Sequence, residues 1–175
     1  VLLSGKPYPI KAMIVSGSNP VLSSPNSEKV KRALGELELL VVMDNFMSAT
    51  AEMADIVLPA ATFLERTDLC SWYFMHLGIP YLTLRKPVVE PLWESWPDWK
   101  FWFELAGRMG YEEYFPWQDI EAALDYFLQP SGITIKQLKE ESAGLFYGSV
   151  KHKKYLERGF NTPSKKVELY SETME

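Results

Sequence analysis

The sequence is poor in the residues that most often bind metals or cross-link a chain. Its 175 residues include one cysteine, Cys70, and two histidines, His76 and His152. A single cysteine excludes an internal disulfide and any multi-cysteine metal site within the chain. The two histidines have no partners at the spacing of a metal site or a nucleophilic triad. We therefore expect Cys70 to be a small buried hydrophobic residue and predict no metal ligand in this chain.

Long apolar runs are also missing. The longest uncharged run, residues 69–84, is broken by a histidine, a glycine and a proline, and is too short to cross a bilayer. Residues 1–9 lack the charged start and the cleavage site of a signal peptide. Because the chain begins without Met and ends in mid-pattern at Tyr170-Ser171-Glu172, we expect it to be a segment of a longer protein.

An excess of basic charge is absent as well. The formal net charge is −5, whereas nucleic-acid-binding proteins need basic patches to neutralise phosphates. The basic cluster at residues 151–158 is local and is interpreted as a solvated helix face. By contrast, 47% of the residues are hydrophobic and 14% are aromatic, which predicts a real core and a large buried surface or interface. No nucleic-acid partner is expected.

The first sixty residues alternate between apolar strands and helices, which predicts an α/β sheet. Strands are expected at 11–16, 39–43 and 55–58, a helix at 28–34, and a small-residue helix between the last two strands. Buried strands joined by helices form parallel sheets. Ligands of such sheets lie beyond the carboxyl ends of the strands, where Asp44 is placed.

The rest of the chain is predicted to be mainly helical. Later elements are expected as a strand at 81–84, a Trp-rich helix at 97–109, an amphipathic helix at 120–127 and a helix after a capping box formed by Thr134 and Gln137. Residues 162–170 have the pattern of a turn entering a strand. We therefore divide the chain into an α/β domain with appended helices, residues 1–142, and a linker with the start of another domain, residues 143–175.

One ordered pattern in the sequence is specific. It consists of Asp44, Phe46, Thr50-Ala51, Ala54-Asp55, Ile56-Val57-Leu58-Pro59, Phe63 and Glu65, preceded by Val15-Ser16-Gly17-Ser18-Asn19-Pro20 and followed by Asp98. Each element alone is weak, but their order and spacing closely resemble the molybdopterin oxidoreductases of the dimethyl sulfoxide reductase family. The resemblance implies a Rossmann-like parallel sheet flanked by helices, followed by a helical segment and the start of a β-barrel domain. In the turn that introduces this barrel, Lys165 replaces the family's usual Gly.

The same resemblance implies a function. The chain would be the part of a molybdenum or tungsten enzyme that holds the guanosine end of one molybdopterin guanine dinucleotide, for two-electron redox or atom-transfer chemistry. The metal ligand and an iron–sulfur cluster would lie in parts of the parent outside this chain. The implied partners are the remaining domains of the catalytic subunit and an iron–sulfur electron-transfer subunit, in the prokaryotic cytoplasm or periplasm. The Trp-rich segment most resembles the polysulfide and thiosulfate reductase branch.

Six residues are candidate cofactor contacts: Asn19, Met43, Asp44, Thr50, Arg66 and Asp98. In the family, the position of Asp44 contacts the guanosine; a carboxylate accepts two hydrogen bonds from a ribose diol or a guanine edge. Its alternative role is to cap the following helix. Asp98 matches a guanine-binding acid, although acids also favour helix starts on electrostatic grounds alone. No catalytic residue is expected in the chain.

The remaining candidates also have structural alternatives. The Thr50 hydroxyl either binds the nucleotide or caps the small helix, a task for which Ser48 is better placed. Asn19 either lies near the cofactor or belongs to a plain turn, and this turn lacks the Gly-x-Gly-x-x-Gly spacing of NAD and FAD sites. Arg66 either pairs with a phosphate or base through its planar fork, or forms a surface salt bridge with a neighbouring acid.

Two rival interpretations remain. The first is a non-catalytic scaffold of the same fold, as in the large iron–sulfur subunit of respiratory NADH dehydrogenase. The second is an unrelated α/β nucleotide-binding domain. A scaffold has no need for acids at a guanine site, so the joint presence of Asp44, Thr50, Arg66 and Asp98 favours cofactor binding.

Overall fold

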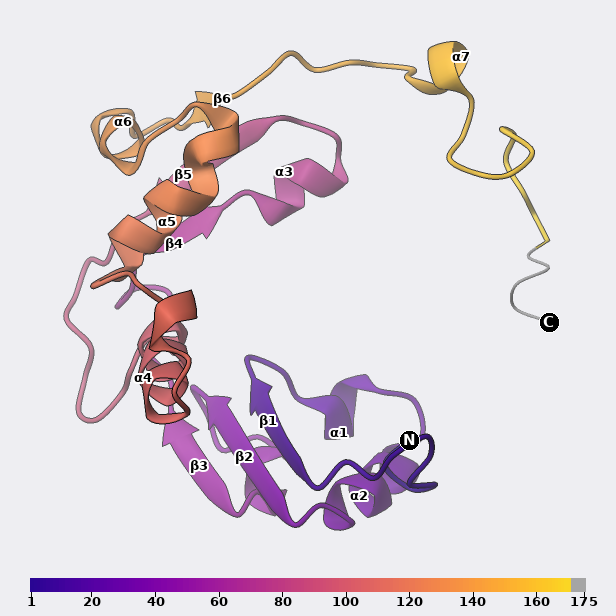
Figure 1. Cartoon of the computed structure of the whole chain (residues 1–175), viewed down its shortest axis with the longest axis vertical. Helices are drawn as coiled ribbons and strands as arrows, with labels where there is room; N and C mark the ends of the chain where they lie inside the picture. The colour runs from indigo at the N-terminus through magenta and orange to yellow at the C-terminus, as the bar shows by residue number, and fades with distance from the viewer. Residues whose placement is uncertain (171–175) are drawn as a thin grey trace.

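The computed structural model describes residues 1–170, which form two small sheets with helices around them (Figure 1). The first sheet is parallel, in the order β1 (Ala12–Ser16), β2 (Leu39–Asp44) and β3 (Ile56–Pro59). The second is antiparallel, in the order β4 (Asp68–Cys70), β5 (Tyr81–Arg85) and β6 (Leu145–Phe146). The helices are α1 (Pro20–Ser23), α2 (Ser27–Gly35), α3 (Trp72–His76), α4 (Asp98–Arg108), α5 (Ile120–Leu128), α6 (Ile135–Glu140) and α7 (Tyr155–Arg158).

The parallel sheet is organised around β2, its central strand. Leu40, Val41, Val42 and Met43 are all buried, as expected for a strand covered on both faces. Leu40 and Val42, which share one face, form a core with Val21 of α1 and Leu34 of α2. Asn26 caps α2 by accepting a hydrogen bond from the Lys29 amide at 3.1 Å. The predicted alternation of strands and helices is therefore confirmed up to β2.

The next crossover differs from the prediction. A single 3-10 turn, Ala51–Met53, replaces the expected small helix between β2 and β3. The turn ends because the Asp55 carboxylate accepts a hydrogen bond from the Leu40 amide at 2.7 Å and ties the chain to the start of β2. The expectation that β3 is buried is also wrong, since Ile56 is 47% exposed. Within residues 1–170, β3 is an edge strand with only an isolated bridge beyond it.

The antiparallel sheet packs against α5 and α6 through a second core. This core consists of Leu82, Leu128, Ile133, Ile135 and Leu138. The predicted strand at 81–84 and the three predicted helices are confirmed, and the capping box of Thr134 and Gln137 is present. Cys70 lies on β4 and is half-buried rather than buried, because this short strand has only β5 beside it.

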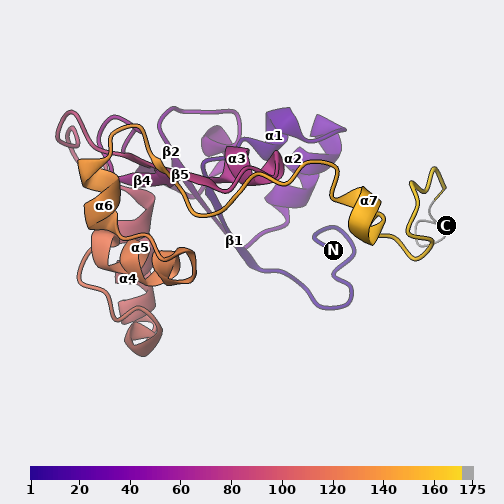
Figure 2. The same cartoon turned by 90° about the horizontal axis from the view of Figure 1, so that it is seen from above.

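The segment after β6 leaves both sheets and runs to α7, as Figures 1 and 2 show from two directions. Its basic residues at 151–158 are exposed, as predicted. The predicted turn closes with a hydrogen bond from the Lys165 amide to the Thr162 carbonyl at 3.1 Å. However, residues 165–170 form no strand, because no neighbouring strand in the described chain can pair with their backbone. Residues 171–175, the end of the predicted pattern, lie outside the described residues.

The predicted boundary near Ser142 precedes β6, so the antiparallel sheet continues past it. The division into domains stays a prediction. Among the helices of residues 1–170, none combines the length and the apolar character that crossing a bilayer requires.

Candidate functional site

The carboxyl ends of the three parallel strands meet at one edge of the first sheet. Ser16 at the end of β1 is the register partner of Met43, and Asp44 at the end of β2 is the partner of Pro59. In Figure 1 the arrowheads of these strands point toward α4. The Gly17 amide donates to the Met43 carbonyl at 3.2 Å and so joins the turn after β1 to β2. Polar side chains from three segments are thereby gathered at one edge.

On one side of the end of β1 lies a hollow of about 350 Å³, which we call the Asn19 hollow. It is lined by Gly17, Ser18, Asn19, Asp44, Asn45, Phe46 and Ser48. Gly17 has a φ of 59°, which favours glycine, and a Cβ placed there would meet nothing within 4 Å. The backbone of this turn therefore faces open space that a ligand can approach.

Asp44 and Asn19 both line this hollow, and each accepts hydrogen bonds from within the chain. The Asp44 carboxylate accepts from the Ser48 hydroxyl at 2.9 Å and from the Phe46 amide at 3.3 Å. Each carboxylate oxygen has two lone pairs, so both oxygens keep capacity for a further donor. The side-chain oxygen of Asn19 accepts a hydrogen bond from the Thr50 hydroxyl at 2.7 Å.

Thr50 itself lies behind the hollow and is completely buried. Its hydroxyl oxygen accepts from the Val21 amide at 3.1 Å, and its proton goes to Asn19. Thr50 does not cap the 3-10 turn, whereas Ser48 Oγ accepts from the Ala51 amide at 3.3 Å, as expected for the cap. Met43 is also buried, and its contribution to this edge is its backbone carbonyl.

Ser16 itself lines a second hollow, of about 330 Å³, which we call the Asp98 hollow. Its polar wall includes Ser16, Arg66, Asp68 and Asp98. The Ser16 hydroxyl donates to Asp98 Oδ1 at 2.5 Å, and Arg66 forms an ion pair with Asp98 Oδ2. The structure thus brings two of the predicted contacts, Arg66 and Asp98, into direct contact.

The pair is the start of a longer series of alternating charges. Arg66 Nε donates to Asp68 at 3.0 Å, and Arg85 approaches the same Asp68 oxygen at 3.3 Å. We call these four residues, Asp98, Arg66, Asp68 and Arg85, the ion-pair chain. It runs from the start of α4 to the β4–β5 hairpin and links the edge of the parallel sheet to the antiparallel sheet.

Sequence reasoning missed several of these residues. Ser16 ends β1 as Asp44 ends β2, so the strand-end argument would have found it. Asp68 was expected only as a neighbouring acid that could pair with Arg66, and Arg85 had no local signal, because only the pairing of β4 with β5 makes it the register partner of Asp68. The structural alternative for Arg66 is present, since it pairs with Asp68, and it also contacts Asp98, while its pairing with a phosphate or base stays a prediction.

Glu65 fixes the loop that carries Arg66. Its side chain is nearly buried and accepts hydrogen bonds from the Thr62 amide at 2.7 Å and the Leu92 amide at 2.9 Å. These bonds, the Thr62 amide first, lower the pKa of the Glu65 carboxyl from its usual 4.5. This glutamate therefore supports the site from behind and does not face either hollow.

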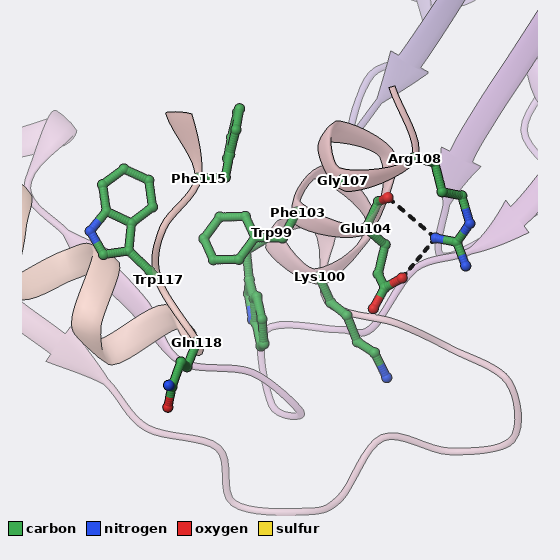
Figure 3. Close-up of a pocket in the computed structure, with 9 residues that line it drawn as sticks. All are labelled: Trp99, Lys100, Phe103, Glu104, Gly107, Arg108, Phe115, Trp117 and Gln118. Carbon is green, nitrogen blue, oxygen red and sulfur yellow. Dashed lines mark hydrogen bonds and ion pairs between the residues drawn. The ribbon is translucent and has the colours of Figure 1, made fainter. Parts of the chain in front are cut away.

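A larger hollow, of about 600 Å³, lies along α4 and contains none of the predicted contacts (Figure 3). Trp99 and Phe103 of α4 face Phe115 and Trp117 across it, and Glu104 pairs with Arg108 beside it. Trp99 also lines the Asp98 hollow. Trp93, in the loop before α4, is 97% exposed because this loop has no cover in the described chain.

Among residues 1–170, no group of three or more histidine, cysteine or acidic side chains is placed to hold a metal ion.

Comparisons with known proteins identify the family of the chain. A family model described as molybdopterin oxidoreductase matches residues 3–108, which include both strand ends, the loop of Arg66 and all of α4. The chain belongs to the molybdopterin oxidoreductase family. The resemblance predicted from the sequence is therefore confirmed, as is the α/β fold.

Relatives in this family match almost the entire chain. Acetylene hydratase of Syntrophotalea acetylenica is 36% identical over 97% of this chain and 23% of its own length. The thiosulfate reductase molybdopterin-containing subunit PhsA of Salmonella typhimurium is 32% identical over 99% of this chain and 26% of its own length. The solved structure of acetylene hydratase from Pelobacter acetylenicus superposes with a TM-score of 0.79 at 34% identity, covering 99% of this chain and 23% of that one.

The family members carry different reaction names. Besides a hydratase and a thiosulfate reductase, they include the F420-dependent formate dehydrogenase subunit alpha of Methanocaldococcus jannaschii, 35% identical over 74% of this chain. Two of these relatives are named as subunits of larger enzymes. The chain spans only about a quarter of the length of its first relatives. Similarity alone therefore does not select the thiosulfate reductase branch.

Proposed function

We propose that this chain holds the guanosine part of one molybdopterin guanine dinucleotide in a molybdenum or tungsten oxidoreductase. The observation that supports this most is the pair of hollows next to the end of β1, one lined by Ser16 and the other by the turn that follows it. Between them they offer carboxylates, a guanidinium and an amide at the carboxyl edge of a parallel sheet, which is where such sheets bind ligands. A dinucleotide needs this mixture of acceptors and donors.

In this proposal, the Asp98 hollow takes the guanine. Each Asp98 oxygen uses one lone pair, for Ser16 or for Arg66, and keeps another. These remaining lone pairs can accept the N1–H and the exocyclic amine of guanine as a bidentate pair. Arg66 offsets the negative charge of Asp98 and holds the carboxylate in place, so the residues present fit the base.

The Asn19 hollow takes the sugar and its phosphate. The free lone pairs of Asp44 suit the two hydroxyls of a ribose. The open backbone at Gly17 and the side chain of Asn19 suit a phosphate oxygen. Met43 and Thr50 contribute from behind, Met43 through the carbonyl that anchors Gly17 and Thr50 through its bond to Asn19.

The bound cofactor would supply the two-electron chemistry at its metal, while this chain binds and orients one end of it. No residue of the chain is assigned a catalytic role. We propose as partners the remaining domains of the catalytic subunit and an iron–sulfur electron-transfer subunit, in the prokaryotic cytoplasm or periplasm.

One observation favours the scaffold alternative. The two arginines and two aspartates of the ion-pair chain already neutralise one another without a ligand, so this chain of charges has a structural use of its own. A scaffold relative, such as the large iron–sulfur subunit of respiratory NADH dehydrogenase, would keep these pairs and hold no dinucleotide.

Chemical analysis of the purified full-length parent distinguishes the two. We expect one molybdenum or tungsten and about two GMP released per polypeptide, the stoichiometry of a bis-dinucleotide cofactor. That result would justify a substrate screen among sulfur oxyanions, polysulfide and formate. A well-folded protein without metal and without GMP would support the scaffold function instead.

A further inference from the structure

Thr50 lies in the connection between β2 and β3, but its hydroxyl is hydrogen-bonded to an earlier part of the chain. It is completely buried and lies between the Val21 amide, at 3.1 Å, and the Asn19 side-chain oxygen, at 2.7 Å. Asn19 lies in the turn after β1 and Val21 lies in α1, 31 and 29 positions earlier in the chain than Thr50. Thr50 therefore acts on the Asn19 hollow from behind.

The directions of these two hydrogen bonds are determined by chemistry. A backbone amide can only donate, so the Thr50 oxygen accepts from Val21. The hydroxyl proton must then find an acceptor, because an unpaired buried donor destabilises the fold. The acceptor beside it is Asn19, which must present its oxygen rather than its nitrogen. The orientation of an Asn amide is assigned from its network in this way.

This arrangement replaces the usual one at the start of α1. An asparagine immediately before a helix normally turns its oxygen back to an amide of the first helical turn. Asn19 makes no such bond, because Thr50 already accepts from Val21. Its oxygen is turned to Thr50, and within residues 1–170 its NH2 group donates no hydrogen bond to protein. Asn19 lines the hollow, so this donor is available there.

We propose that Thr50 is a positioning residue that fixes Asn19 as a hydrogen-bond donor toward the bound nucleotide. One side of the Asn19 hollow then donates, through Asn19, while the Asp44 side accepts. A phosphate oxygen can accept from Asn19, and a neighbouring ribose hydroxyl can donate to Asp44, so a nucleotide matches both sides of the hollow. This inference rests on the proposed function and deepens it, because it assigns a hydrogen-bonding polarity to the site.

The test compares three single variants of the full-length parent: Thr50→Val, Thr50→Ser and Thr83→Val. Valine keeps the shape of threonine but removes the hydroxyl, and serine keeps the hydroxyl. Thr83 is the matched control, because its hydroxyl also donates a hydrogen bond within the chain, to the Cys70 carbonyl at 3.4 Å, but Thr83 lines neither hollow. The measurements are the rate at which GMP-containing cofactor is lost on dilution, and the crystal structure of each protein.

We expect Thr50→Val to lose cofactor about tenfold faster than wild type, the effect of misplacing one hydrogen bond to a charged group. Thr50→Ser and Thr83→Val should stay near wild type. In the Thr50→Val crystal structure, Asn19 should turn its oxygen to the abandoned Val21 amide. A double variant, Thr50→Val with Asn19→Ala, should lose cofactor no faster than Asn19→Ala alone.

Wild-type retention in Thr50→Val, or additive losses in the double variant, would overturn the positioning role. A wild-type parent that purifies without GMP would instead overturn the proposed function. In that case the crystal structures decide the role of Thr50: an Asn19 side chain that turns in Thr50→Val supports the positioning, and one that does not move refutes it.

Discussion

The two sheets differ in how they place polar groups. In the parallel sheet all strands end at the same edge, so Ser16 and Asp44 meet there and each has a hollow beside it. In the antiparallel sheet the strands run in opposite directions, and Asp68 pairs with Arg85 directly across from it. Parallel strands thus leave polar groups available to a ligand, whereas antiparallel strands bring opposite charges together and neutralise them.

The two sheets are nevertheless connected through Arg66. This residue contacts Asp98 on the ligand side and Asp68 on the antiparallel side. We infer that the parallel sheet provides the binding groups and that the antiparallel sheet helps to hold them. The following predictions, all for the full-length parent, test that division of roles.

The largest effect is expected from truncating the two cores with the same substitution. We call each sheet together with its core the parallel unit and the antiparallel unit. Leu40 in the core of the parallel unit is 2% exposed, and Leu138 in the core of the antiparallel unit is 1% exposed. Leu40→Ala and Leu138→Ala should each destabilise their own unit by about 2–5 kcal/mol, the usual cost of such a cavity. Hydrogen–deuterium exchange should locate the loss in each unit. Only Leu40→Ala should release GMP readily, and equal release from both variants would contradict the division of roles.

The next largest effect is expected at the Asp98 hollow. Asp98→Asn removes the charge that faces Arg66 and one of the two guanine acceptors, so dinucleotide binding should weaken by about 10- to 100-fold. The measurement is GMP per polypeptide after extensive dialysis. Asp119→Asn is the matched control, because Asp119 caps α5 and asparagine caps equally well. Unchanged GMP in Asp98→Asn would remove Asp98 from the site.

Glu65 should give a smaller effect that depends on pH. Its folded-state pKa is lowered by the amides of Thr62 and Leu92, so its stabilisation is present above the ordinary value of 4.5. It is lost as the pH falls through the lowered folded value. Thermal unfolding should therefore show Glu65→Gln less stable than wild type at pH 7, with the difference shrinking below pH 4.5. A difference that grows on acidification would contradict the assigned hydrogen bonds.

The smallest effect is expected at the outer end of the ion-pair chain. The Arg85 side chain is 42% exposed, so solvent and salt screen its contact with Asp68. Arg85→Gln should speed cofactor loss by roughly twofold, and only at low salt. Lys139→Gln, which breaks the pair with Glu121 inside the antiparallel unit, should leave the rate unchanged. A tenfold effect of Arg85→Gln would make the antiparallel sheet part of the site rather than its support.

Strong local patterns predicted most of the fold. The apolar run of β2, the Asn26 cap of α2 and the capping box of α6 depend on neighbouring residues, and the structure has each of them. The failures concern elements that need distant partners. The exposure of β3 depends on whether another strand lies beyond it, and the strand expected at residues 165–170 had no strand to pair with.

The candidate site divides in the same way. The sequence by itself determined the family and the placement of Asp44 at the end of a buried strand, because both are written in the order and spacing of nearby residues. Only the tertiary structure decided that Asp98 meets Ser16 and Arg66, and that Thr50 binds Asn19 rather than capping its own turn. These contacts join residues 31 to 82 positions apart. Hydrogen bonds and ion pairs act over a few ångströms, so they form only after folding has brought such residues together.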